Sequence, residues 1–223
     1  MPLEQSKKGM DFNMKKFARE FFKLFWIFVF GCIMGYVMEV IFNFVRTGEF
    51  ETRQGLIYGP FAPVYGIGTL VFYLILPKFK KMWQVFLVSG VLGGVTEYLC
   101  SYFQEKLFGT ISWDYSNQLL NFNGRTSILY CIVWGALGFA FIKFVYPYFD
   151  KIFDKVLYKI ETKVITAFAV VFMIFNISIS SLAAQREYER REHIEAESRM
   201  DVFLDEHFPD EILDEVYRNR IEK

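Results

Sequence analysis

The stretch FFKLFWIFVFGCIMGYVMEVIFNFV, residues 21–45, decides the fold class. About 20 mostly apolar residues are enough for a helix to cross the hydrocarbon core of a bilayer, and this run is longer. A basic segment precedes it, as in a signal peptide, but the apolar run is too long for one and lacks a cleavage site of small residues. We therefore predict a retained first membrane-spanning helix.

Four further apolar windows follow in the 223-residue chain, at about 60–77, 84–104, 127–146 and 163–184. The chain is 53% hydrophobic and contains 27 Phe, which is more aromatic and apolar than soluble domains usually are. The sequence thus predicts an all-α integral membrane protein with about five transmembrane helices. The window at 60–77 is the shortest of the five.

Charge patterning orients these helices. Lys and Arg are concentrated in residues 1–20, in the turn at about 78–83 and in an amphipathic loop at 147–162, and the positive-inside rule places these segments in the cytoplasm. The other connectors and the tail at 185–223 then fall outside. The tail is acidic, with 13 Asp and Glu against 7 Lys and Arg in residues 186–223, and its helical spacing predicts a helix capped by Asp210. We expect a cytoplasmic N-terminus and an extracytoplasmic C-terminus.

The first four helices show signs of an internal duplication. In each half a glycine precedes a glutamate by four residues, at Gly35 and Glu39 and again at Gly93 and Glu97. A second pair of glycines, eleven residues apart, follows in each half, at Gly55 and Gly66 and again at Gly124 and Gly135. The four-helix membrane core at 21–146 is therefore predicted to consist of two parallel-repeated helical hairpins, at about 28–77 and 86–146. A pseudo-twofold axis along the membrane normal would relate them.

Glu39 and Glu97 are the strongest candidates for a functional site. A carboxylate at the centre of a spanning helix costs at least about 2.5 kcal/mol, so one that persists usually faces a cavity or a partner. Small residues near both glutamates permit close helix approach, and we expect the two Glu-bearing helices to contact each other. The carboxylates would then share a proton, bind a cation or pair with the outer arginines. The alternative is a structural role, as an ion pair or as a protonated acid hydrogen-bonded to a neighbouring helix.

The outer connectors supply the other candidates. The predicted substrate- or ion-binding site consists of Glu39, Glu97, Arg53, Trp113, Asp114, Tyr115, Asn121, Asn123 and Arg125. The second connector is 11 residues longer than the first, and WDYSN lies in the excess, where it could cover the glutamates as a lid or pocket wall. Tyr65 and Trp134 are interpreted as members of an interfacial aromatic belt.

Several chemistries have no support in the sequence. Both histidines lie in the tail, and the three cysteines lie in apolar segments without C-x-x-C spacing, so neither a His-based triad nor a zinc site is indicated. The chain has no nucleotide-binding or nucleic-acid-binding motif. We expect no metal and no cofactor, and ATP hydrolysis would require another chain.

With GLIYGPFAPVYGIG, WDYS, NFNGR and WGALG, the chain resembles the ABC-transporter type IV family of CmpB-like permeases, which is itself similar to the TMEM229 proteins. The resemblance covers about residues 25–145 and leaves the fifth span and the tail outside. It implies a permease subunit that works with a separate ATPase. In the family pattern Arg directly precedes Gly in the first connector, whereas Gln54 here separates Arg53 from Gly55.

Three functions fit these observations. The first is a permease or transporter subunit with a polar site near the outer face. The second is a structural or accessory membrane protein whose polar cluster locks the helices together. The third is an intramembrane enzyme acting on lipid or envelope precursors, for which the sequence offers no clear nucleophile and base. The partners considered are membrane lipids, an ATPase subunit and a second copy of the chain, but no nucleic acid.

Overall fold

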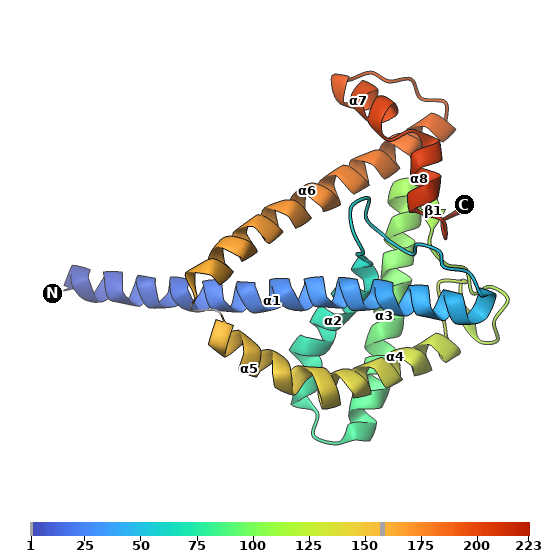
Figure 1. The fold of residues 1–223 in the computed structure, drawn as a ribbon. Coiled ribbons are helices and arrows are strands. Elements are labelled where there is room, and N and C mark those ends of the chain that lie inside the picture. Colours follow the sequence, from blue (N-terminus) through green and yellow to red (C-terminus); the bar gives the residue numbers. More distant parts are fainter. Residues whose placement is uncertain (1, 157–158) are drawn as a thin grey trace.

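The computed structural model describes residues 2–156 and 159–223, and side chains from residue 16 onward except those at 150, 153, 154 and 160. The elements run in the order α1 (Pro2–Thr47), α2 (Pro63–Ile75), η1 (Leu76–Lys78), α3 (Met82–Phe108), β1 (Thr110–Ile111), β2 (Asn121–Phe122), β3 (Thr126–Ser127), α4 (Ile128–Ala140), η2 (Phe141–Val145), α5 (Tyr146–Val156), α6 (Ile160–Arg191), α7 (Arg199–His207), α8 (Asp210–Val216) and β4 (Ile221–Glu222). Figure 1 shows long helices that cross one another at wide angles. The predicted all-α fold class is confirmed.

Within the described residues, four helices are long and apolar enough to cross a membrane, namely Lys16–Thr47, Met82–Phe108, Ile128–Phe149 and Glu161–Arg191. The predicted span at 60–77 is a shorter apolar helix, Pro63–Lys78. Its 16 residues reach about 24 Å, less than the hydrocarbon thickness of about 30 Å. The helix count agrees with about five, but the second of these helices is too short to cross an average bilayer by itself.

α1 and α2 form one antiparallel hairpin, and α3 and α4 form another. Gly31 and Gly35 of α1 lie against α2, whereas Gly90 and Gly94 of α3 lie against Cys131 of α4. A Cβ atom at any of the four glycines would overlap atoms of the partner helix, so their absence of a side chain permits the close approach. The expectation that these small residues bring α1 and α3 together is therefore wrong, because each set packs within its own hairpin.

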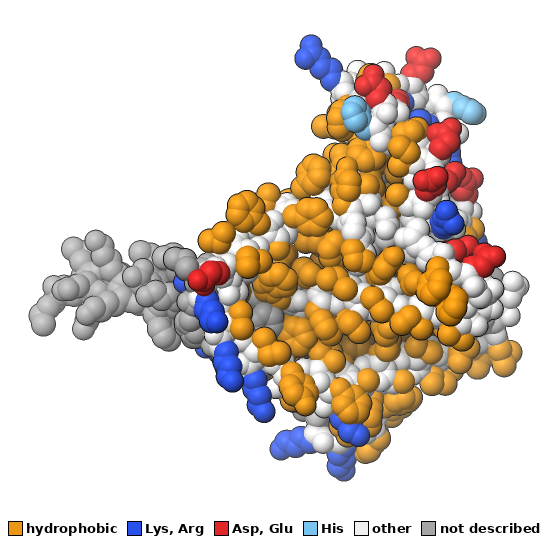
Figure 2. Space-filling model, in the orientation of Figure 1, with side chains coloured by type: hydrophobic (Ala, Val, Ile, Leu, Met, Phe, Trp, Pro, Cys, Tyr) orange, Lys and Arg blue, Asp and Glu red, His pale blue; other side chains and the backbone are white. Residues whose placement is uncertain are grey.

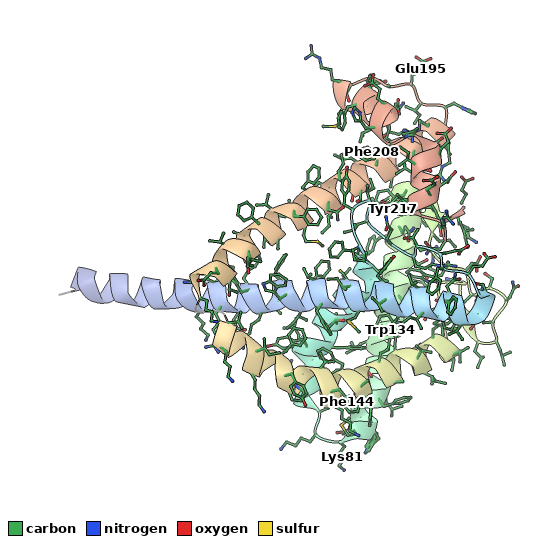
Figure 3. All side chains as sticks on the ribbon, in the orientation of Figure 1. Lys81, Trp134, Phe144, Glu195, Phe208 and Tyr217 are labelled. Carbon is green, nitrogen blue, oxygen red and sulfur yellow. The ribbon has the colours of Figure 1, made fainter. Side chains whose placement is uncertain are left out.

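The two hairpins meet through aromatic rings of α2 and α4. The ring centroids of Tyr65 and Trp134 are 5.3 Å apart, and those of Phe72 and Phe141 are 6.3 Å apart. Figure 3 labels Trp134 near the middle of the molecule. Tyr65 and Trp134 directly precede the matched glycines of the predicted repeats, and each phenylalanine follows seven residues later. Each contact thus joins matched positions, as a pseudo-twofold axis would produce, although the duplication stays a prediction.

The basic turns lie at one end of the molecule. Lys78, Lys80 and Lys81 are exposed around the turn between α2 and α3, and Lys151 and Lys155 are exposed on α5. Figure 2 shows Lys and Arg side chains gathered along that edge, while most of the Asp and Glu side chains lie at the opposite end. The predicted amphipathic loop forms α5. The side chain of Phe153, residues 157–158 and the side chains of residues 1–15 lie outside the part of the chain that the structure describes.

The acidic tail folds back on the outer connectors. β4 pairs antiparallel with β1, which places the tail beside the loop that follows α3 (Figure 1). Apolar side chains of the tail also pack on α6 and on the first connector, in a cluster of Ile57, Ile179, Ala183, Leu204, Phe208 and Leu213. The tail is therefore packed against the membrane core rather than separate from it.

Ion pairs hold the tail helices on α6. Arg190 donates to Asp210 at 2.5 Å and to Asp205 at 2.7 Å. The predicted cap at Asp210 is wrong, because Pro209 is the N-cap residue of α8 and the Asp210 carboxylate is bound by Arg190 instead. Arg220 forms an ion pair with Glu187 of α6, and both side chains are largely buried.

Candidate functional site

Glu97 lies on α3 and is only 5% exposed. The Tyr115 hydroxyl donates to its Oε1 atom at 3.0 Å, and the Thr126 hydroxyl donates to its Oε2 atom at 2.8 Å. The Trp134 side chain also lies near this carboxylate. The two hydroxyl donors come from the long connector and from β3, and Trp134 belongs to α4, so three separate segments converge on one carboxylate.

Both hydroxyl donors to Glu97 are uncharged, and no cation pairs with it among the residues that the structure describes. Removing a carboxylate from water without a countercharge costs several kcal/mol, and hydrogen bonds to the ionised form offset part of that cost. The two hydroxyl groups can also accept a hydrogen bond from a protonated acid. The site is therefore suited to hold Glu97 both as a carboxylate and as a carboxylic acid.

Glu39 is connected to the same cluster through Tyr65. The Tyr65 hydroxyl donates to Glu39 Oε1 at 2.5 Å, and its ring packs on Trp134, which lies near Glu97. The two carboxylates are close enough to interact electrostatically. Two glutamates from different helices thus flank one pair of aromatic rings. Tyr65 and Trp134 occupy matched positions of the predicted repeats, and each lies against the glutamate of its own hairpin.

Arg125 does not pair with either of these glutamates. Its guanidinium donates to Glu105 at 2.6 Å and to Ser101 at 3.3 Å. It also lies over the rings of Tyr98 and Tyr102, at 5.9 and 5.5 Å from their centroids. Arg125 therefore fixes the long connector to the C-terminal turns of α3, and its charge is balanced by Glu105 rather than by Glu97.

Arg53 has the corresponding role in the first hairpin. It donates to Asn43 at 2.5 Å and to Glu51 at 3.0 Å. Asn43 and Ser101 each lie four residues after the glutamate of their half, so both arginines bind equivalent positions of α1 and α3. Gln54, which interrupts the family pattern, donates to the Ile57 carbonyl and leaves this contact intact.

Asp114 lies at the surface of the connector, away from Glu97. It accepts from the backbone and hydroxyl of Ser116 at 2.8 and 2.5 Å, and from Lys223 Nζ at 2.9 Å. These hydrogen bonds, first from Ser116 and then from Lys223, lower the pKa of Asp114 from 3.8 to about 2. Asp114 thus organises a turn and receives the tail.

The two asparagines and Trp113 stabilise the connector itself. Asn121 donates to the Gln118 carbonyl and accepts from the Gly124 backbone at 2.9 Å. Asn123 adopts a left-handed conformation, with φ of 52°, which Asn tolerates better than most residues. The Trp113 indole donates to the Arg125 carbonyl at 2.8 Å. These side chains do not converge on the glutamates.

Tyr115 connects the connector to Glu97. Burial, reinforced by the nearby Glu97 charge, raises the pKa of the Tyr115 phenol well above its ordinary value, so it remains a neutral donor. Its ring stacks on Tyr130 of α4, with centroids 3.9 Å apart. The WDYSN segment therefore covers Glu97 through Tyr115 alone.

The structure divides the nine predicted residues into two groups. Glu97 and Tyr115 touch directly, and Glu39 joins them through Tyr65. The other six hold the connectors together, namely Arg53, Trp113, Asp114, Asn121, Asn123 and Arg125. Sequence reasoning misses Thr126, and it assigns Tyr65 and Trp134 to a belt. For Tyr65 and Trp134 the sequence does offer a signal, because each directly precedes a matched glycine of the predicted repeats.

Comparison with known proteins gives one result. Residues 26–181 match the model of the family described as "Putative ABC-transporter type IV". This match extends well beyond residue 145 and includes most of α6, so the expectation that the fifth helix falls outside the family is wrong. Neither a curated protein nor a solved structure matches the chain. The match includes both glutamates, both connectors and more than half of the chain, and the chain belongs to the putative ABC-transporter type IV family.

Proposed function

We propose that this chain is the membrane-spanning component of a transporter in which Glu97 takes up and releases a proton. Its family and its apolar helices fit a membrane transporter component. The observation that carries the proposal is the environment of Glu97, which is 5% exposed, hydrogen-bonded by two uncharged hydroxyl groups and without a cationic partner among the described residues. A buried ionisable group in a spanning helix is typical of proton relays in pumps and transporters.

A proton suits this site better than a metal ion does. Metal ions such as Ca²⁺ and Mg²⁺ need about six or more oxygen ligands arranged around them. The oxygens of Glu97 already face hydroxyl donors, and no group of three or more His, Cys, Asp or Glu is placed to hold a metal within the described residues. A proton needs no such shell, because the same hydroxyl groups serve both states of the acid.

The direction of access follows from the proposed topology. The exposed lysines of α5 and of the turn between α2 and α3 lie at one end of the molecule. This supports a cytoplasmic location for that end and for the N-terminus. The connectors and the tail would then face outward. Tyr115 belongs to the outer connector, so displacement of this loop would connect Glu97 with the outer solution.

We also infer a separate ATPase partner from the family. The turn between α2 and α3 is too short to hold a coupling helix, which leaves α5 as the surface for this partner. Copurification of an ATPase with the native protein, lost on replacing Lys151 and Lys155 by Glu, tests this part of the proposal. Retention of the ATPase by that variant would exclude α5 as the docking surface.

A charge-displacement measurement tests the role of Glu97 without a known substrate. The full chain is reconstituted into phospholipid vesicles adsorbed on a solid-supported membrane, and the current that follows a pH jump is recorded. We expect a transient current in the wild type, its loss in Glu97→Gln and its retention in Glu105→Gln. Glu105 is a matched control because it lies two turns farther along α3 and pairs with Arg125.

Protein amount and detergent melting temperature are compared for the same preparations, so that unfolding is not mistaken for loss of proton exchange. Equal currents in the wild type and in folded Glu97→Gln would refute the proposal. The absence of any current in the wild type, together with destabilisation of Glu97→Gln, would identify the cluster as a structural lock.

A further inference from the structure

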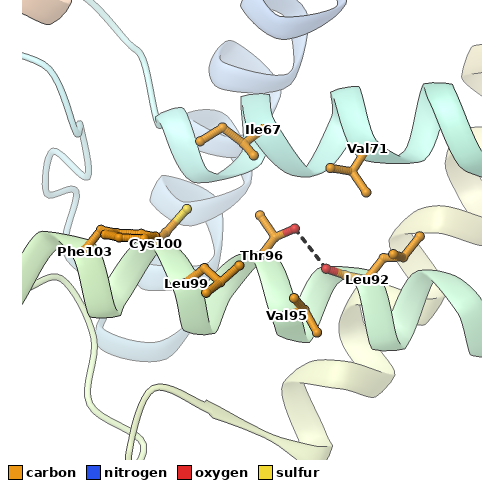
Figure 4. Close-up of a pocket in the computed structure, with 8 residues that line it drawn as sticks. All are labelled: Ile67, Val71, Leu92, Val95, Thr96, Leu99, Cys100 and Phe103. Atoms are coloured by element: carbon orange, nitrogen blue, oxygen red, sulfur yellow. Dashed lines mark hydrogen bonds between the residues drawn. The ribbon is translucent and has the colours of Figure 1, made fainter.

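A groove of about 480 Å³ lies between α2 and α3, on the face shown in Figure 4. Its lining consists of Ile67, Val71, Leu92, Val95, Thr96, Leu99, Cys100 and Phe103. The Thr96 hydroxyl donates to the Leu92 carbonyl of its own helix, so it offers no free donor to a ligand. The groove therefore presents an almost entirely apolar surface within a membrane-spanning segment.

A cation lies beyond one end of this groove. Lys106 follows Leu99 by seven residues and Phe103 by three, which places it on the same face of α3, one turn beyond the lining. Lys106 is exposed, and it has no acidic partner within the described part of the chain. It lies toward the outer end of α3, where the connector begins. An apolar groove that ends at an unpaired ammonium has the shape and charge of a phospholipid site.

We propose that this groove binds one acyl chain of an anionic phospholipid whose phosphate contacts Lys106. Lipid tails are as apolar as the groove, so burial of the chain gives no selectivity by itself. Selectivity comes from the attraction between the phosphate and Lys106, since a basic residue near a membrane surface contributes about 1 kcal/mol toward anionic lipid. This lipid site lies on a face of α3 that does not contain Glu97. The proposal therefore does not depend on proton exchange at Glu97.

A second copy of the chain fits the groove less well. Helices in membranes associate closely through small residues, whereas the rim of this groove is formed by Ile, Val, Leu and Phe. A twofold interface built on the same face would also bring the two Lys106 side chains toward each other, and like charges would oppose it. The lipid satisfies both the apolar lining and the cation.

Photocrosslinking in vesicles of defined composition tests the site. The full chain is reconstituted in phosphatidylcholine vesicles that contain either phosphatidylglycerol or phosphatidylcholine with a diazirine on one acyl chain, at equal mole fractions. Labelled peptides are then mapped by mass spectrometry. We expect the phosphatidylglycerol probe to label residues 67–71 and 92–103 more strongly than the phosphatidylcholine probe does. Lys106→Gln should lower this preference about fivefold.

Two further variants define the groove. Leu99→Trp fills it and should reduce labelling by both lipids, whereas Val91→Trp, on the exposed face of α3 outside the lining, should not. Lys81→Gln at the opposite end should leave the preference unchanged. Equal labelling by the two lipids in the wild type, or a preference that survives Lys106→Gln, would overturn the proposal. A Cys100 disulfide between two chains, with the lining unlabelled, would assign the groove to a second copy.

Discussion

The Tyr115 hydroxyl donates to Glu97 at 3.0 Å and thereby joins the connector between α3 and α4 to the middle of α3. The same connector is held from the other side by the tail, because Lys223 donates to Asp114 at 2.9 Å and β4 pairs with β1. A continuous set of contacts therefore leads from the tail through the connector to Glu97. The tail thus holds the same connector that covers Glu97.

Tyr115→Phe removes the hydroxyl and retains the ring that stacks on Tyr130. Because a hydrogen bond to a charged group contributes about 1.5–3 kcal/mol, we expect a clear decrease in the detergent melting temperature. Tyr102→Phe is the control, since its ring contact with Arg125 survives the change. Equal melting of both variants and the wild type would show that the Tyr115 hydroxyl does not stabilise the fold.

Gly93→Ala and Gly35→Ala test the packing within the hairpins. Alanine normally stabilises a helix relative to glycine by roughly 0.5–1 kcal/mol. Here the new Cβ atom would overlap the ring of Trp134 or Tyr65, and overpacking costs about 1–3 kcal/mol. We expect both variants to melt at lower temperature, and a higher melting temperature in either one would argue against that hairpin's geometry.

Asp114 provides a prediction about pH. Its pKa in the folded protein, about 2, is below the ordinary value of 3.8, so its contacts with Ser116 and Lys223 stabilise the fold above about pH 4 and lose that contribution as the pH falls toward 2. The carboxyl carbon shift of Asp114, followed by NMR in micelles, should titrate near pH 2. In Lys223→Gln the midpoint should rise but stay below 3.8, because Ser116 still donates. A wild-type midpoint near 4 would rule out these contacts.

Arg220→Gln should release the tail from α6. It leaves Glu187 buried without its ion-pair partner, and breaking a buried pair from one side costs about 3–5 kcal/mol. Limited proteolysis of the reconstituted protein should then cut residues 195–220 faster than in the wild type. Arg218→Gln is the control because Arg218 is exposed, and equal cleavage of the two variants would contradict the pairing.

The sequence predicts the membrane class well because apolar runs of about 20 residues are typical of membrane-spanning helices. It also identifies Glu97, since a carboxylate is conspicuous in such a run. It does not identify the partner of each helix face: the glycines of α1 and α3 indicate close packing, but only the three-dimensional arrangement shows that α2 and α4 receive them. The apolar window at 60–77 also does not show that its helix begins only at Pro63 and is therefore too short to cross.

The site is harder to predict for a similar reason. An aromatic residue near a helix end can face lipid headgroups or the protein interior, and the sequence does not distinguish these, so Tyr65 and Trp134 are assigned to a belt. The arginines look like partners for Glu39 and Glu97 because all four recur in the two halves. In the folded chain the arginines instead pair with Glu51 of the first connector and Glu105 of α3, and the glutamates of the core receive uncharged donors.

The proposed proton exchange at Glu97 can be observed directly by infrared difference spectroscopy. Reconstituted membranes are exchanged between high and low pH, and the carbonyl stretch of a protonated carboxylic acid is recorded in the wild type, Glu97→Gln and Glu105→Gln. We expect a band that appears on acidification in the wild type and Glu105→Gln and is missing in Glu97→Gln. Spectra that are identical in the wild type and folded Glu97→Gln would show that Glu97 does not exchange a proton, and the proposed role would be wrong.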